Sequence, residues 1–409
     1  MSAPHGAHVD IAALRERVAP IPVRRGVQAM FGIMIAIGAI SFLIAVRSDA
    51  ARDRQLAYAS FLVGYVYVLG IALAGTFFTA LHYLVGATWS VVVRRVAEAF
   101  SSYLPVALGL LLVLLLGIPH LYVWSTHPVV EGGHALDLTK GGWLSPGAFT
   151  IRLGLILGLW TLFAWYFRRN SLRQDQTGDV SLTRASGRAA AVFILLFALT
   201  ATLVAFDLLM SLEPTWYSTI FGVYFFAGLW QAGLAALAIV VVLLRRMGAL
   251  EGVVNRFHYW DLGKYMFAFS VFWMYIAFSQ FMLIWYANLP EETGWMIKRT
   301  FTSWGGIGIA LIVMRFAIPF FALMPVRVKE NEVALVTIAG IILVGHWLDL
   351  YWTILPAFSE RGVALGWTEI GITLGFLGLF GWTVLHFLSR NPVAAHRDPL
   401  FEESVRFHG

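Results

Sequence analysis

Positions 27–46 read VQAMFGIMIAIGAISFLIAV, an apolar stretch without a charged side chain. About 20 such residues in a helix span the hydrocarbon core of a bilayer. The stretch is too long for a signal-peptide core and lacks a convincing small-residue cleavage site, so we expect an uncleaved first span. Nine further apolar runs of spanning length lie near 56–85, 99–125, 147–167, 187–211, 217–244, 260–286, 300–322, 333–355 and 366–389. The sequence therefore predicts an all-α polytopic membrane protein with about ten transmembrane helices.

The composition supports this fold class and excludes several functions. The chain has 409 residues, of which 59% are hydrophobic and 13% charged, whereas soluble domains carry about 25% charged residues. It has no cysteine, so it cannot ligate an iron–sulfur cluster through thiolates, attach a c-type haem or form a disulfide. Its net charge of +6 is spread over short loops and forms no basic tract for nucleic acid. Any iron–sulfur or c-type haem centre that serves this chain must belong to another subunit.

Loops rich in Lys and Arg alternate with poor ones along the chain, and short cytoplasmic loops carry the excess of these residues. With the N-terminus inside, the cytoplasmic segments contain Arg15, Arg17, Arg24, Arg25, Arg94, Arg95, Arg168, Arg169, Arg173, Arg184, Arg188, Arg245, Arg246, Arg256, Arg327, Lys329, Arg390, Arg397 and Arg406. The outer segments then contain Arg47, Arg52, Arg54, Lys140, Lys298, Arg299 and Arg361. We therefore predict an even number of spans with both termini in the cytoplasm.

Two predicted spans end in the same pattern. Positions 207–214 (DLLMSLEP) and 349–356 (DLYWTILP) both read D-L-x-x-[ST]-[LI]-x-P. Because each unit would hold an even number of spans, we predict two parallel-repeat four-helix bundles flanked by one helix at each end. Chance similarity at helix exits is the alternative. The predicted boundaries are 1–26 for a cytoplasmic segment, 27–55 for the first helix and outer loop, 56–214 and 215–356 for the bundles, 357–389 for the last helix and 390–409 for a cytoplasmic tail.

Several ionisable or polar side chains fall inside the predicted spans, where a charge costs about 2.5–3.5 kcal/mol on insertion scales. The outer half holds Asp207, Glu213, His120, Gln280, His346 and Asp349, and the inner half holds His82, Asp261, Lys264 and His386, with Arg315 near the middle or inner half of its span. His346, Asp349 and Thr353 share one helix face. Asp261 and Lys264 are placed to form an ion pair.

One face of the seventh span is predicted to link these inner and outer sets. It carries Asp261, Lys264, Ala268, Val271, Tyr275, Ser279, Met282 and Tyr286 at steps of three or four residues. The candidate proton path is then Asp207, Glu213, His120, Gln280, His346, Asp349, His82, Asp261, Lys264, Tyr275 and Ser279. The alternative is hydrogen bonding between helices, worth about 0.6–2 kcal/mol per contact. A carboxylate is a poor choice for that role, which favours a function for Asp207 and Asp349.

A quinone headgroup needs a proton-exchanging group beside a hydrogen-bonding partner. The candidates for such a pocket are Asp207, Asp349, His346, Trp285 and Tyr286. The two aromatic residues are alternatively members of the interfacial belt. Axial ligation of haem b by His82 and His386, or by His120 and His346, is a further alternative. No motif indicates a catalytic residue or a metal site.

Three stretches carry a family resemblance: 206–219, 261–288 and 346–352. With the ten spans and the Asp–Pro helix exits, they resemble the NrfD/PsrC group of quinol-interacting membrane subunits. They are most similar to the ActF subunit of bacterial alternative complex III, a quinol:cytochrome c oxidoreductase. The resemblance extends from about 25 to 390.

This resemblance implies a subunit of the bacterial inner membrane that is not catalytic alone and contributes a quinone-proximal surface, a proton path, or both. It implies menaquinone or another quinone as the ligand, with haem c and iron–sulfur clusters in the partners. The implied partners are a paralogous NrfD-like subunit (ActC), an iron–sulfur subunit (ActB), multihaem cytochrome c subunits (ActA and ActE) and small membrane anchors. A secondary transporter of a small solute and a haem b-binding quinol subunit are the alternative functions.

Overall fold

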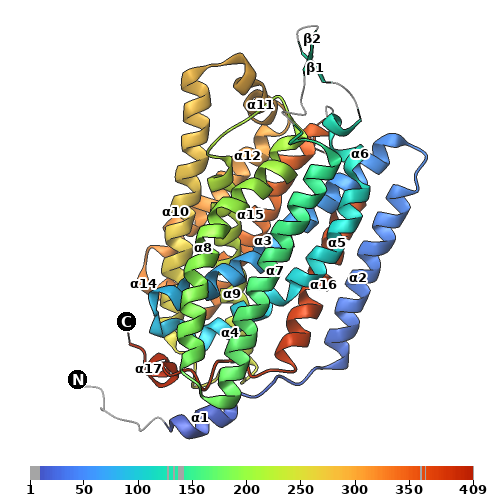
Figure 1. Cartoon of the computed structure of the whole chain (residues 1–409). Helices are drawn as coiled ribbons and strands as arrows, with labels where there is room; N and C mark the ends of the chain where they lie inside the picture. The colour runs from blue at the N-terminus through green and yellow to red at the C-terminus, as the bar shows by residue number, and fades with distance from the viewer. Residues whose placement is uncertain are drawn as a thin grey trace.

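The computed structural model describes residues 10–126, 129–131, 134–136, 142–359, 362–363 and 365–408. Figure 1 shows a bundle of long helices that run side by side. One end of it carries α1 (Ile11–Arg17) and α17 (Phe401–Val405) and is called the termini end. The opposite end carries α11 (Pro290–Thr300) and a hairpin of β1 (Val129–Glu131) and β2 (His134–Leu136), and is called the distal end.

Ten spans in the described part of the chain are long and apolar enough to cross a bilayer, which confirms the predicted all-α polytopic fold. Single helices form α2 (Arg25–Val46), α3 (Ala51–Val85), α7 (Pro146–Thr177), α9 (Phe221–Arg246), α10 (Arg256–Ala287) and α16 (Trp367–Leu388). Two further spans are built around α8 (Ser181–Leu208) and α15 (Glu332–Ile354). The third span contains α4 (Val91–Phe100) and α5 (Leu104–Leu116). The eighth contains α12 (Gly305–Leu311) and α13 (Ile318–Leu323), joined by a π-helical turn at Ile312–Ala317. Short helices are α6 (Ile118–Leu121) and α14 (Val326–Lys329).

Some predicted span edges are wrong. The polar, basic segment 168–186, expected as a loop, is almost entirely helical, because α7 continues to Thr177 and α8 begins at Ser181. Gly178 ends α7 in the left-handed conformation, with φ of 70°, which glycine adopts without the steric cost of a Cβ atom. The third span also lies earlier than predicted, at Thr88–Leu116 rather than 99–125. Lys140 and Arg361 of the charge count lie outside the described residues.

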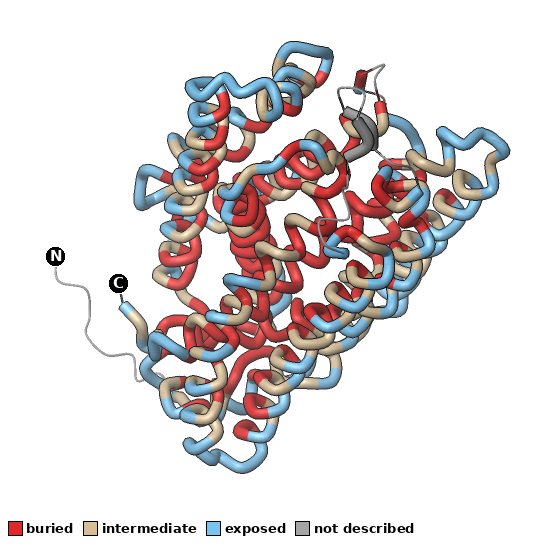
Figure 2. Tube along the Cα trace, turned by 45° about the horizontal axis from the view of Figure 1, so that its top comes forward, coloured by how far each residue is buried: buried red, intermediate tan, exposed pale blue. Residues whose placement is uncertain are grey.

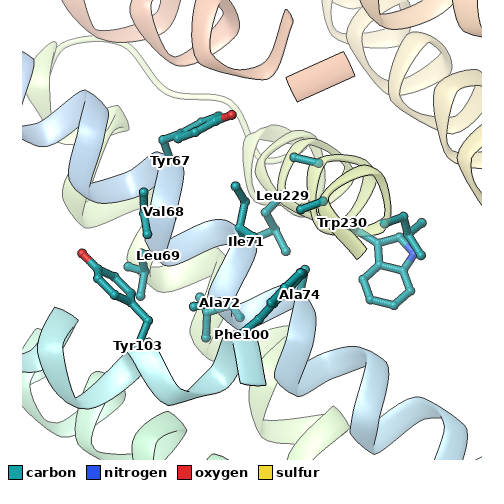
Figure 3. Packing of buried hydrophobic residues seen from close by; sticks show 14 of the residues in the cluster. Tyr67, Val68, Leu69, Ile71, Ala72, Ala74, Phe100, Tyr103, Leu229 and Trp230 are labelled. Carbon is teal, nitrogen blue, oxygen red and sulfur yellow. The ribbon is translucent and has the colours of Figure 1, made fainter. Parts of the chain in front are cut away.

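The helices α3 and α9 form the centre of the bundle. They are the two most buried spans in the described chain, and Figure 2 shows buried residues concentrated inside the bundle, with exposed ones around it. In the close-up of Figure 3, Ile71 and Ala74 of α3 lie towards Leu229 and Trp230 of α9, with Phe100 of α4 beside them. These apolar contacts between central helices make the interior in which the polar groups below are buried.

The helix contacts have a repeated pattern. The helix α3 packs against α8, α9 packs against α15, and each central helix also touches the other's partner. These helices are the first and last of each predicted four-helix unit. The pattern agrees with two related units, although their division stays a prediction.

The first and last spans pack against each other, with α2 lying along α16 (Figure 1). A Cβ atom built on Gly375 would lie 2.7 Å from the Cα of Gly38, so a side chain at position 375 has no room. Small residues of this kind let helix backbones approach closely in membranes. The two flanking helices therefore form one pair on the side of the bundle.

The C-terminal segment is not a free tail but packs against the termini end. Arg94 donates to the carboxylate of Asp398 over 2.5 Å, and both side chains are buried. The adjacent Arg95 pairs with Asp175 of α7. The sequence placed Arg94 and Arg95 in a loop, but they lie in the buried helix α4.

Candidate functional site

A buried ion pair lies inside the second predicted four-helix unit. The guanidinium of Arg315 donates to the carboxylate of Asp349 on α15, and the hydroxyl of Tyr224 on α9 donates to the other oxygen of that carboxylate. All three side chains are buried. We call Asp349, Arg315, Tyr224 and Gln231 the Asp349 centre.

Gln231 of α9 completes the coordination of Arg315. Its side-chain oxygen accepts hydrogen bonds from Nε and Nη2 of Arg315 over 3.0 and 2.7 Å. Its amide nitrogen donates to the hydroxyl of Ser270 on α10 over 2.8 Å. The ring of Trp273 lies 4.4 Å from the guanidinium carbon. The centre therefore joins α9, α10, α15 and the eighth span through hydrogen bonds that compensate for the burial of two charges.

Arg315 projects from the π-helical turn within the eighth span. Such turns are rare and are frequent at functional sites. The extra residue in the turn shifts the side chains that follow relative to an α-helix. From this turn the guanidinium of Arg315 reaches Asp349.

His346 lies one turn before Asp349, and Thr353 lies one turn after it, with all three buried, as their predicted common face requires. Neither ring nitrogen of His346 has a hydrogen-bond partner in the described part of the chain. The ring lies 5.6 Å from that of Tyr67 on α3. His346, Asp349, Thr353 and Tyr224 also line a cavity of about 10 Å³, close to the space that one water needs.

Asp207 forms a corresponding ion pair in the first predicted unit. Its carboxylate accepts two hydrogen bonds from Arg152 of α7, over 2.6 and 2.8 Å. Arg152 also donates to the backbone oxygen of Trp143 and lies over its ring. The sequence singled out Asp207, but its partner Arg152 was missed. An arginine inside an apolar run is itself an intramembrane charge and was the signal available.

Glu213 pairs with Arg299 at the distal end, where Nη2 of Arg299 lies 2.6 Å from Oε1 of Glu213. Arg299 also donates to the backbone oxygen of Thr353 over 2.8 Å. It belongs to α11, whose Trp295 stacks on Trp216 at 4.2 Å. Arg299, counted among the outer loop charges, is thus a buried anchor that fixes α11 over the ends of α8 and α15.

A largely apolar cavity of about 350 Å³ lies beside the Asp349 centre. We call it the α10–α12 cavity, because α10, α11 and α12 supply most of its wall. Tyr224 of the Asp349 centre lines it, together with Trp273, whose ring contacts Arg315, and with Gln280 and Arg299. The exposed side chains of Phe278 and Ile309 form part of its rim. The cavity therefore connects a lipid-facing surface to a buried carboxylate through one phenol.

Gln280 is the polar group in this cavity that lacks a partner at its side-chain oxygen, although the residue is buried. It also lines a second cavity of about 170 Å³ towards the distal end, with Glu292 of α11. The sequence placed Gln280 in the candidate proton path. The structure places it in the wall of the cavity that Tyr224 of the Asp349 centre also lines.

The residues predicted for the inner half of the membrane do not form one cluster. His82 is buried among Phe78, Trp89 and Tyr265, and its Nδ1 lies 2.8 Å from the backbone oxygen of Phe78. Asp261 and Lys264 form the expected ion pair. The side chain of Lys264 is half exposed and lies over the ring of Trp260.

The expected polar stripe on the seventh span faces the wrong way to link the inner and outer sets. Tyr275 is 63% exposed and Tyr286 is 84% exposed, and Ser279 is partly exposed beside them. The buried face of α10 instead carries Ser270, Trp273 and Gln280. The error arose because this helix is apolar on all sides, so periodicity does not distinguish its inner face.

Three further candidates lie away from the Asp349 centre. Trp285 is 69% exposed near the distal end of α10, and neither it nor Tyr286 lines the α10–α12 cavity. His120 stacks on Tyr58 at 5.2 Å. His386, considered with His82 for haem b, is exposed on α16.

Tyr224, Gln231 and Trp273 were not singled out in the sequence. Gln231 is a polar residue inside an apolar run, which is the signal that singled out Gln280. Nothing local distinguishes Tyr224 and Trp273 from packing residues, because their role depends on Asp349 and Arg315 from distant spans. Comparisons with models of known families and with curated proteins give no match to this chain.

Proposed function

We propose that this chain is the quinol-interacting membrane subunit of an electron-transfer complex, and that a quinol ring binds in the α10–α12 cavity. One observation carries the proposal: a buried amide oxygen without a partner, on Gln280, lies in a largely apolar cavity that shares Tyr224 with the Asp349 centre. Apolar pockets of roughly 300–1,000 Å³ with a few polar groups are typical ligand sites.

The polar groups suit the reduced ligand. A quinol hydroxyl donates a hydrogen bond, and the side-chain oxygen of Gln280 is an acceptor. The phenol oxygen of Tyr224 can accept a second one while its proton points to Asp349. The apolar wall suits the ring, and the exposed rim at Phe278 and Ile309 lets an isoprenoid tail remain in the lipid.

Oxidation of a quinol to a quinone releases two electrons and two protons. Tyr224 and Asp349 offer a route for a proton away from the ring, with His346 as the next group. In this proposal the electrons pass to iron–sulfur and c-type haem centres outside this chain, because it has no cysteine for either. As the family resemblance implies, the proposed assembly includes an iron–sulfur subunit (ActB), multihaem cytochromes c (ActA, ActE), a paralogous membrane subunit (ActC) and small anchors.

The test is photolabelling of the purified protein with an azido-quinol in lipid nanodiscs. We expect label on α10 and α12, with a loss of roughly tenfold in affinity for Gln280→Leu, because the replaced group no longer pairs with the ligand. Gln28→Leu, an exposed position on α2, is the matched control. Labelling that ignores the Gln280 substitution would rule out this cavity.

Purification from native membranes tests the assembly. The proposal requires haem c and iron–sulfur absorbance in fixed stoichiometry with this chain. A chain that is isolated alone and moves a solute across vesicles would instead be the alternative secondary transporter. A b-type haem band in the isolated chain would support the haem b alternative.

A further inference from the structure

A second cavity, of about 350 Å³, shares no lining residue with the α10–α12 cavity and lies where α2 ends and α3 and α16 begin. The residues that line it come from the end of α2, the following turn, and the first turns of α3 and α16. Because the ends of membrane-spanning helices lie near the lipid headgroups, we expect this cavity at headgroup level. We call it the α2–α16 cavity.

Its polar lining consists of two carboxylates, Asp53 and Glu369, and the hydroxyls of Ser41, Ser48 and Thr368. Glu369 is only 6% exposed. One of its oxygens accepts the backbone N–H of Gly366 over 2.9 Å, which caps α16. No Lys or Arg in the described chain forms an ion pair with Glu369. A buried carboxylate normally has a cationic partner, so a cation beside Glu369 would complete the lining. Arg54 of the same turn instead donates to the backbone oxygen of Ser48 over 2.7 Å.

Ser41 gives independent evidence for a ligand. It is 4% exposed and lines the cavity, and its hydroxyl has no hydrogen-bond partner in the described residues. Asp53 is held in place by Ser48, whose hydroxyl donates to its carboxylate over 2.7 Å. A ligand that donates several hydrogen bonds and carries a positive charge would satisfy Ser41, Asp53 and Glu369 together. A primary ammonium group has three donors and fits this description.

The surroundings indicate that the ammonium belongs to a lipid. Ile44 and Trp367 line the cavity and are 68% and 64% exposed on the lipid-facing side. Trp367 offers an aromatic face to a cation. Arg47 and Arg52 flank the same turn and are exposed, which suits a phosphate next to the amine. We propose that the α2–α16 cavity binds the ammonium of an ethanolamine-type lipid headgroup, independently of the proposed quinol site.

The test uses native mass spectrometry on the full-length protein, with phosphatidylethanolamine, phosphatidylcholine and free ethanolamine as probes. The trimethylated ammonium of phosphatidylcholine has no N–H donor, so we expect it to be retained about tenfold less well. Glu369→Gln should abolish the preference. It keeps the cap of α16, because the glutamine oxygen still accepts from Gly366. Ser41→Ala gives a second, smaller loss.

Asp49→Asn is the control, since it removes one exposed acidic charge from the same turn without lining the cavity. It should leave the preference for phosphatidylethanolamine unchanged. Equal retention of the two lipids, or an unchanged preference in Glu369→Gln, would overturn the proposal. Binding of free ethanolamine as tight as that of the lipid would overturn the assignment to a membrane lipid. None of these outcomes bears on the quinol site, which the Gln280 variant tests separately.

Discussion

Arg315 and Asp349 form an ion pair between the eighth and ninth spans, with both side chains buried. Arg152 and Asp207 form the equivalent pair between the fourth and fifth spans. In each predicted four-helix unit the third helix supplies the arginine and the fourth supplies the aspartate. The correspondence extends to the next turn, where Ser211 and Thr353 each follow their aspartate by four residues. The shared D-L-x-x-[ST] pattern therefore coincides with a shared tertiary contact, which supports the predicted repeat.

The two pairs differ in solvent access, which predicts different costs of breaking them. Asp349→Asn leaves a guanidinium with 0% exposure unpaired, whereas Asp207→Asn leaves Arg152, which is 14% exposed. Removing one partner of a buried pair costs about 3–5 kcal/mol. We expect Asp349→Asn to lower the free energy of unfolding by about that amount, and Asp207→Asn by less. Chemical unfolding in mixed micelles measures both.

A double-mutant cycle with Arg315→Met is the control for this prediction. If the ion pair is the cause, the Asp349→Asn, Arg315→Met double variant should be more stable than Asp349→Asn alone. Additive losses would show that the two residues act independently. Quinol turnover of the Asp→Asn variants must therefore be compared per amount of folded protein, because these substitutions also lower stability.

Tyr224→Phe separates an effect on function from an effect on stability better than Asp349→Asn does. It removes the donor to Asp349 but leaves the Arg315 pair and the ring packing in place. If the phenol relays the quinol proton, turnover in the whole complex should fall roughly 10²-fold, with quinol affinity changed much less. Steady-state quinol oxidation measures the first and photolabelling the second. Wild-type turnover in Tyr224→Phe would remove the phenol from the route.

The ten spans were predictable because apolar length alone identifies them, and no tertiary information is needed. The acids at the helix exits were also predictable, since Asp207 and Asp349 are unusual within apolar runs. Their partners were harder to identify. Gln231 acquires a role only through Arg315, and Tyr224 through Asp349, which lie 84 and 125 residues later in the sequence. The polar stripe on α10 was wrong for a related reason: a helix that is apolar all round does not reveal which face packs inward.

The contact of the first and last spans gives a prediction about assembly of the fold. Gly375→Val places two methyl groups against the backbone of Gly38, where even a Cβ atom is too close. Overpacking of this kind typically costs about 1–3 kcal/mol, and we expect α2 to separate from α16. Increased proteolysis in the α2–α3 turn would report it. Gly32→Ala, where the added Cβ meets nothing within 4 Å, should behave like the wild type.

The predicted orientation can be tested by labelling single introduced cysteines, because the chain has no cysteine of its own that would react. Ser48→Cys lies in the turn between α2 and α3, and Ser389→Cys lies just after α16, at the opposite end of the bundle. With the termini in the cytoplasm, a membrane-impermeant maleimide added to intact cells should label position 48 and spare position 389. The reverse pattern would place the termini outside and invert the assignment of inner and outer sets.

The C-terminal segment predicts a pH dependence at the termini end. His396 lies outside the spans, and its Nδ1 is 3.5 Å from the carboxylate of Asp175. Burial lowers the pKa of His396 below 6.5, against the attraction of Asp175, and Arg95 and Arg397 add to the lowering. The unfolded chain therefore takes up a proton on this residue at a higher pH than the folded chain. The stability that neutral His396 contributes is fully present above about pH 6.5. It is lost as the pH falls from there through the lowered pKa of His396 in the folded chain.

We expect the melting temperature of the purified protein to be lower at pH 5.5 than at pH 7.5. His396→Asn should reduce this dependence of the melting temperature on pH. His408→Asn, at an exposed position close to the end of the chain, should retain the wild-type slope. Equal slopes in the wild type and His396→Asn would assign the pH dependence to other groups. Proteolysis after residue 390 at the two pH values shows whether the segment detaches. Since Asp398 holds the same segment through Arg94, protonation of His396 alone should loosen it without releasing it.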